Sequence, residues 1–128
     1  MGYNSGMTKY NEVTLKDLQA MIRQFVDDRD WDQFHNPKDL SISLTLEATE
    51  VLEHFQWKNS EEMLKHSSDK KEDIGEELAD VFYWVLLLSN KLEIDLVDAF
   101  KKKMDKNHAK YPIDKAKGSH KKYTELET

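Results

Sequence analysis

The sequence contains no cysteine, which excludes both a disulfide framework and a metal site built on thiolates. It also lacks any run of about 20 consecutive apolar residues, the length that a membrane-spanning helix needs. The first residues do not show the basic-then-apolar layout of a secretory signal peptide. These absences together predict a cytoplasmic protein with no membrane partner.

An excess of positive charge is also missing, because 19 Lys and Arg residues stand against 25 Asp and Glu residues in a chain of 128. Proteins that bind nucleic acid polymers usually carry a basic surface that neutralises phosphates, so the net charge of −6 argues against such a partner. A small anion such as a nucleotide stays compatible with this charge, since a bound metal ion reverses the sign of the local field.

Hairpin signals are absent and helical periodicity runs through most of the chain, so we expect an all-α fold. Capping side chains mark three of the helix starts, at Thr14, Asn36 and Asp95. The predicted helices cover 14 to about 26, 36 to about 57, near 68 to about 92, and 95 to 112, with a short helix or turn opening at Ser60. We therefore expect an N-terminal arm over 1–13, one helical domain over 14–112, and a polar, mobile tail over 113–128.

Two pairs of acidic residues suggest a metal site. Glu47 and Glu50 are three residues apart, as are Glu77 and Asp80, so the members of each pair share one face of a predicted helix. Like charges at this spacing repel each other, and two such pairs facing across a helix contact would favour a cation between them. Mg²⁺ fits this donor set because it prefers carboxylate oxygens and keeps several waters. Spacing alone also allows the simpler interpretation, an ordinary solvated acidic surface.

Aromatic side chains near these acids are candidates for stacking on a nucleotide base. Trp31 and His35 fall in a polar connection rather than on an apolar stripe, which favours a binding role. Trp57 stands at a predicted helix end, and Trp84 follows the second acidic pair. Packing in the protein core is the alternative for each of them, because buried aromatic residues dominate cores.

The acidic pairs belong to a longer series of motifs. They stand as Glu47-Ala48-Thr49-Glu50 and Glu77-Leu78-Ala79-Asp80, and the accompanying segments are RDWDQFHNPKDL at 29–40, FQWK at 55–58, and KMDKN with KYP within 103–112. In this order the motifs resemble the MazG-like, all-α nucleoside triphosphate pyrophosphohydrolases, most closely the dCTP pyrophosphatase branch. The likeness extends from about Leu15 to Pro112. One departure is Trp84, where we expect Tyr in that branch.

The resemblance implies a four-helix bundle subunit that assembles into a homodimer or homotetramer. It implies cleavage of a nucleoside triphosphate between the α- and β-phosphates, with dCTP or a modified dCTP as the first candidate substrate. Mg²⁺, with Mn²⁺ as a substitute, would be held by Glu47, Glu50, Glu77 and Asp80, and Glu50 would take the proton of the attacking water. The residues expected at the substrate are Trp31, His35, Lys38, Trp57, Trp84, Lys103, Asn107 and Lys110.

Two other functions stay open from the sequence. A broad-specificity or dUTPase-like enzyme that removes unwanted nucleotides would use the same metal ligands with a different base pocket. A non-catalytic helical module that binds nucleotides or a partner would keep the bundle without turnover, although the presence of all four acids argues against it. Lys103, Asn107 and Lys110 also have a simpler interpretation, as polar residues of an ordinary solvated helix end.

Overall fold

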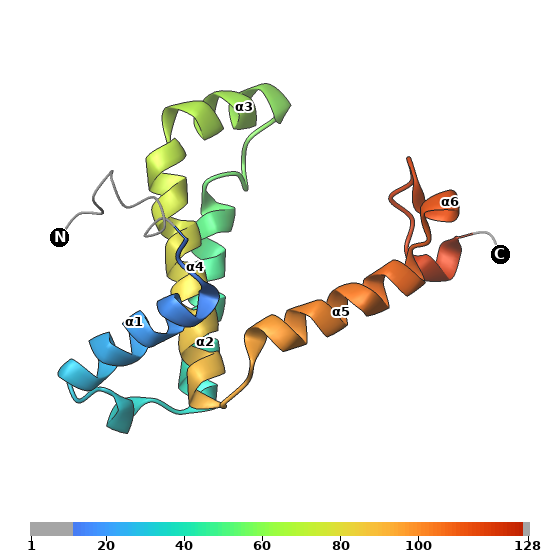
Figure 1. The fold of residues 1–128 in the computed structure, drawn as a ribbon. Helices are drawn as coiled ribbons and strands as arrows, with labels where there is room; N and C mark the ends of the chain where they lie inside the picture. Colours follow the sequence, from blue (N-terminus) through green and yellow to red (C-terminus); the bar gives the residue numbers. More distant parts are fainter. Residues whose placement is uncertain (1–11, 127–128) are drawn as a thin grey trace. The chain divides into compact units, whose positions relative to one another are not determined.

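The computed structural model describes residues 12–126 as a helical protein, and this stretch contains no β-strand. The all-α fold class is therefore confirmed (Figure 1). The elements in chain order are α1 (Leu15–Asp28), the 3₁₀ turn η2 (Asp32–Phe34), α2 (Pro37–Glu53), α3 (Ser60–Asp69), α4 (Lys71–Lys91), α5 (Leu96–Lys110), α6 (Ile113–Ala116) and the 3₁₀ turn η3 (Tyr123–Glu125). Residues 1–11 of the predicted N-terminal arm lie outside the described residues.

The helix starts predicted from capping residues are confirmed. The Thr14 hydroxyl accepts a hydrogen bond from the Asp17 amide, and the Asp17 carboxylate accepts one from the Thr14 amide, which completes a capping box. Asn36 caps α2 in the same way through the Asp39 amide, and Pro37 occupies the first position of the helix. Asp95 caps α5. These local bonds fix where each helix begins.

The predicted helix count and two predicted boundaries were wrong. The described residues contain six α-helices rather than four, because α3 is a full helix of 10 residues with its own capping box at Asn59 and Glu62, and because α6 lies in the segment predicted as a tail. Helix α2 ends at Glu53 rather than near Trp57, since the amides of the next two residues bond to carbonyls only three positions back. Helix α4 begins at Lys71 rather than Ser68, because Lys70 leaves the helical conformation at φ −115° and ψ 26°.

The chain divides into two compact units, at residues 93 and 94. In the first unit α2 and α4 run side by side in opposite directions, and α1 packs across α4 (Figure 1). Its buried apolar residues come from these three helices: Ile22, Val26, Leu40, Leu86 and Leu87. Buried Ser89 of α4 accepts a hydrogen bond from Gln19 of α1 at 3.0 Å, so a polar contact also joins these helices. The acidic pairs are thereby carried by the two helices that contact each other most.

The second unit, over residues 94–126, consists of α5, α6 and η3. The segment predicted as a tail contains α6 and η3, and its chain returns to the end of α5, where the rings of Tyr111 and Tyr123 lie 6.1 Å apart. The mobility of this segment stays a prediction. No helix among residues 12–126 has the length and apolar character needed to cross a membrane.

Candidate metal and nucleotide site

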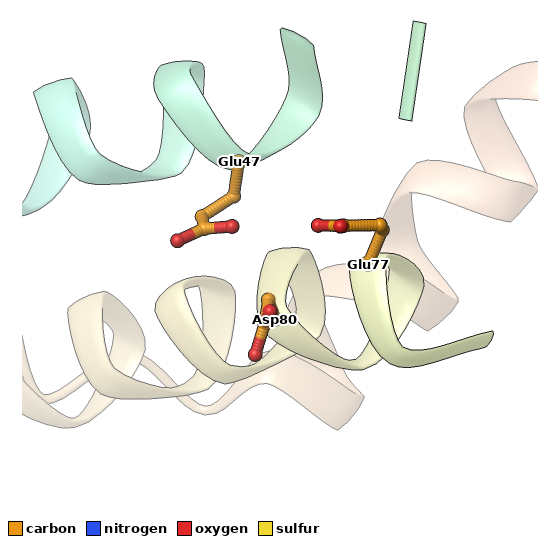
Figure 2. A group of neighbouring side chains, drawn as sticks. All are labelled: Glu47, Glu77 and Asp80. Atoms are coloured by element: carbon orange, nitrogen blue, oxygen red, sulfur yellow. The ribbon is translucent and has the colours of Figure 1, made fainter. Parts of the chain in front are cut away.

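Three carboxylates meet where α2 and α4 face each other. Glu47 extends from α2 toward α4, and Glu77 and Asp80 extend from neighbouring turns of α4 (Figure 2). One carboxylate oxygen from each residue lies within 4.8 Å of the other two. The i, i+3 spacing on α4 places its two acids on one face, as the sequence predicted, and the antiparallel packing brings the α2 acid to them.

Two oxygens of this cluster are buried without a partner. Glu47 Oε2 and Glu77 Oε2 are inaccessible to solvent and make no hydrogen bond. Burying an unpaired carboxylate oxygen is expensive, so native proteins normally satisfy such atoms with donors, water or a cation. No ion pair among residues 12–126 involves any of the four predicted metal ligands. The donor set and its unmet hydrogen-bonding capacity therefore fit a divalent cation.

Glu50 lies beside the three-carboxylate cluster rather than within it. Its pKa is raised from the ordinary range, chiefly by the neighbouring carboxyl of Glu77. The pKa of Glu47 is also raised, first by partial burial and then by the carboxyls of Glu50 and Asp80. Neighbouring carboxyls contribute to both shifts, since negative charge accumulates between the helices and no ion pair among the described residues offsets it. A cation bound at the cluster would lower the pKa of both glutamates.

The Trp84 side chain is half-buried and stands one turn beyond Asp80 on α4. Its indole N–H approaches the carboxylate of Glu47 and lowers that pKa, which offsets part of the upward shift. The ring packs edge-on against Tyr83, with centroids 5.1 Å apart. Trp84 therefore contacts a predicted metal ligand, and its role in stacking on a base stays a prediction.

The other predicted base contacts of the first unit lie outside its core. Trp31 and Trp57 are exposed, Trp57 to 86%, on the loop before α2 and the turn after it. His35 is half-buried, and its Nδ1 atom is inaccessible and has no hydrogen-bond partner. Lys38 is exposed on the first turn of α2. Exposed aromatic rings and an unsatisfied imidazole nitrogen are compatible with ligand binding, and the four roles stay predictions.

The predicted phosphate contacts Lys103, Asn107 and Lys110 all lie on α5, in the second unit. The two lysines are exposed, and the Lys110 ammonium stands 4.7 Å from the centre of the Tyr123 ring. The Asn107 amide donates to Met104 Sδ at 3.9 Å. Their contact with substrate stays a prediction.

Two polar contacts were not predicted from the sequence. His54 Nδ1 and His66 Nε2 lie 2.8 Å apart and join the turn after α2 to α3. Lys91 Nζ lies 3.1 Å from Asp32 Oδ1 and joins the end of α4 to the loop before α2. Neither pair has a spacing signal, since the partners stand 12 and 59 residues apart.

Comparison with known proteins agrees with the all-α fold and with the family resemblance. The MazG-like family matches residues 42–126. The chain is 38% identical to dCTP pyrophosphatase 1 of Mus musculus over 117 residues, which covers 90% of this chain and 69% of the mouse protein. Its identity to dCTP pyrophosphatase 1 of Homo sapiens is likewise 38%, with the same coverage.

A solved structure is also similar. The crystal structure of a pyrophosphatase from Archaeoglobus fulgidus superposes with a TM-score of 0.71 at 35% sequence identity, covering 88% of this chain and 97% of the archaeal one. The family match exceeds half of the chain, and the curated relatives are matched over more than two thirds of their own length. The protein belongs to the MazG-like family and is a nucleoside triphosphate pyrophosphatase.

Proposed function

We propose that this protein cleaves dCTP, or a base-modified dCTP, to the monophosphate and pyrophosphate in a Mg²⁺-dependent reaction. The observation that carries the proposal is the approach of Glu47, Glu77 and Asp80 to within 4.8 Å, with two of their oxygens buried and unsatisfied. The names of the similar curated proteins support dCTP as the first substrate to test.

The three clustered carboxylates would hold the metal ion, and Glu50 would complete the ligand set from the adjacent turn of α2. When bound, Mg²⁺ supplies positive charge that neutralises the triphosphate and stabilises the pyrophosphate leaving group. Mn²⁺ would substitute because it accepts the same oxygen ligands.

Glu50 is the best candidate for the general base. Its carboxyl lies beside the cluster rather than within it, so one of its oxygens is available to a water molecule. In the proposed reaction Glu50 accepts the proton of the water that attacks the α-phosphorus, and the bond between that phosphorus and the α,β-bridging oxygen breaks.

Base recognition would fall to the aromatic residues and to His35. Trp31, Trp57 and Trp84 offer rings for stacking. His35 Nδ1, buried and unpartnered, suits a hydrogen bond to the polar edge of a pyrimidine. Lys38, together with Lys103, Asn107 and Lys110 of α5, supplies positive charge and donors for the triphosphate.

The direct test is pyrophosphate release from a panel of dNTPs and NTPs with Mg²⁺. We expect turnover of dCTP or its modified forms, and a loss of about 100- to 10,000-fold in kcat for Glu50→Gln. Glu76→Gln is the matched control, because Glu76 is an exposed acid on α4 outside the cluster. No pyrophosphate from any triphosphate would refute the proposal, and preferred cleavage of dUTP or of all substrates alike would replace dCTP with the alternative specificities.

We also infer that the subunit works as a homodimer or homotetramer. Buried apolar side chains among residues 12–126 are few, whereas Ile42 and Leu46 of α2 are 48% and 59% exposed. They line an open, largely apolar groove of about 340 Å³ together with Lys38, Ser41 and Thr45. Exposed apolar surface of this kind commonly marks an interface, and a second copy is the partner that the resemblance implies.

A further inference from the structure

The loop between α1 and α2 has a defined shape that begins at the end of α1. Asp30 adopts a left-handed conformation with φ 53°, and the amides of Asp30 and Trp31 donate to the carbonyls of Asp27 and Val26 at 3.1 Å each. This pattern is a Schellman motif, which ends a helix and turns the following residue back onto it. Accordingly, the Trp31 ring packs edge-on against Phe25, with centroids 5.7 Å apart.

The remainder of the loop is fixed by short-range bonds and by one contact to another helix. The Gln33 amide donates to the backbone carbonyl and the carboxylate of Asp30, each at 2.9 Å. Asp32 forms an ion pair with Lys91 at 3.1 Å, and within residues 12–126 this is the one ion pair or side-chain hydrogen bond that joins loop residues 29–36 to α4. The loop carrying Trp31 and His35 is thus tied to the helix that carries Glu77 and Asp80.

The packing around this ion pair is open. Asp32 and Lys91 line a cavity of about 320 Å³ whose walls also include Arg23, Val26 and Leu87. The loop borders this cavity at Asp32, away from the contact of Trp31 with Phe25, so a polar contact at Asp32 has more influence on the position of this part of the loop. Lys91 is also the last residue of α4, 11 positions beyond Asp80, which corresponds to about 16 Å along the helix. The pair is therefore too distant from the acidic cluster to act on the reacting phosphate.

We propose that the Asp32–Lys91 ion pair positions the loop that recognises the base, so that Asp32 and Lys91 are positioning residues for substrate affinity and not catalytic residues. This inference rests on the proposed function, in which Trp31 and His35 contact the base. Loss of the pair leaves the carboxylates of α2 and α4 in place and releases the loop from α4. It should therefore weaken substrate binding without slowing the chemical step.

The test compares Lys91→Met and Asp32→Asn with the wild-type enzyme, using dCTP and Mg²⁺. We expect each variant to raise KM about 3- to 5-fold, the range for a partly exposed ion pair, while kcat stays within about 2-fold. The charge-swapped double variant Asp32→Lys with Lys91→Asp should restore most of the affinity. Lys65→Met is the matched control, because it removes the exposed ion pair with Asp69 inside α3.

A second measurement separates failure of this inference from failure of the proposed function. The amides of Trp31, Phe34 and His35 are hydrogen-bonded within the loop or to α1, so their hydrogen exchange reports loop order without any substrate. Faster exchange in Lys91→Met but not in Lys65→Met supports the positioning role even if the wild type turns over no triphosphate. Unchanged exchange overturns the role, as does an active variant with unchanged KM or with a fall in kcat alone.

Discussion

At the scale of single residues, Glu47 combines burial, like charge and an unmet hydrogen bond. Its pKa is raised, first by burial and then by nearby carboxyls, and its Oε2 atom has no partner. A carboxylate with a raised pKa in the folded state destabilises that state at pH values where the unfolded chain is ionised. Glu47 therefore destabilises the metal-free fold, as expected for a residue that binds a cation.

Replacing Glu47 separates its effect on the stability of the metal-free fold from its effect on metal binding. We expect Glu47→Gln to raise the melting temperature of the metal-free protein at neutral pH, because one of the repelling charges is gone, and to lack the further rise that we expect Mg²⁺ to cause in the wild type. Thermal melts with EDTA and with Mg²⁺ measure both. Glu53→Gln, at an exposed acid of α2, should retain the Mg²⁺ effect. A full Mg²⁺ response in Glu47→Gln would contradict the assignment of this residue as a ligand.

His66 makes stability depend on pH for a different reason. Its pKa is lowered from 6.5, first by burial and then by the positive charge of Lys58, with further contributions from His54 and Lys70. The unfolded chain then binds the proton more readily, so the folded state loses stability as pH falls below about 6.5. The 2.8 Å contact with His54 needs a lone pair on one of the two ring nitrogens, so it is lost only when both rings are protonated.

We therefore expect the melting temperature of wild type to fall more between about pH 7 and pH 5 than that of His66→Gln. Wild type and His66→Gln have the same carboxylates, so the difference between their melting temperatures does not include the carboxylate contribution. His108→Gln, at an exposed histidine of α5, should behave as wild type. Equal slopes for wild type and His66→Gln would show that this histidine has no such role.

At the scale of secondary structure elements, α4 contains one residue that weakens it. Gly75 lies inside the helix, and a Cβ atom added there would meet nothing within 4 Å. Because glycine disfavours helix interiors, we expect Gly75→Ala to increase the free energy of unfolding by about 0.5–1 kcal/mol. Chemical denaturation monitored by circular dichroism measures this change. A destabilised variant would indicate a close neighbour at this position, such as a second subunit.

The elements also show what the sequence predicts well. Local signals succeed: Thr14, Asn36 and Asp95 cap helices as expected, because their partners lie three residues away. For α3 the sequence predicts only a short helix or turn at Ser60, because the segment opens with polar residues, whereas the structure has a full helix with a capping box at Asn59 and Glu62. The acid spacing placed Glu77 and Asp80 on one face, and the fold brings Glu47 to them, whereas Glu50 lies beside the cluster. The role of all four as metal ligands stays a prediction.

The contacts that were missed depend on how the chain folds back on itself. His54 meets His66 across a turn whose path depends on where α2 ends, and that end was predicted too late. Asp32 meets Lys91 only because α4 returns antiparallel to α2 and finishes near the loop before it. No local periodicity encodes such an encounter, so it becomes visible only in the folded chain.

At the scale of the whole molecule, the exposed apolar face of α2 leads to a test of assembly. We expect the wild type to elute as a dimer or tetramer in size-exclusion chromatography with light scattering. Charges placed on this face, in the double variant Ile42→Glu with Leu46→Glu, should shift it toward the monomer, because each would be buried unpaired at an interface. Leu64→Glu is the control, at a residue 76% exposed on α3. A wild type that is monomeric at all concentrations would contradict the proposed assembly.

We propose that the carboxylates between α2 and α4 support cleavage of dCTP between its α- and β-phosphates. Separation of the products of dCTP by anion-exchange chromatography, with Mg²⁺ and with EDTA, tests it most directly. We expect dCMP and pyrophosphate in equal amounts, only with the metal, and neither product in Asp80→Asn. Formation of dCDP and phosphate, or product formation that persists in EDTA or in Asp80→Asn, would contradict it.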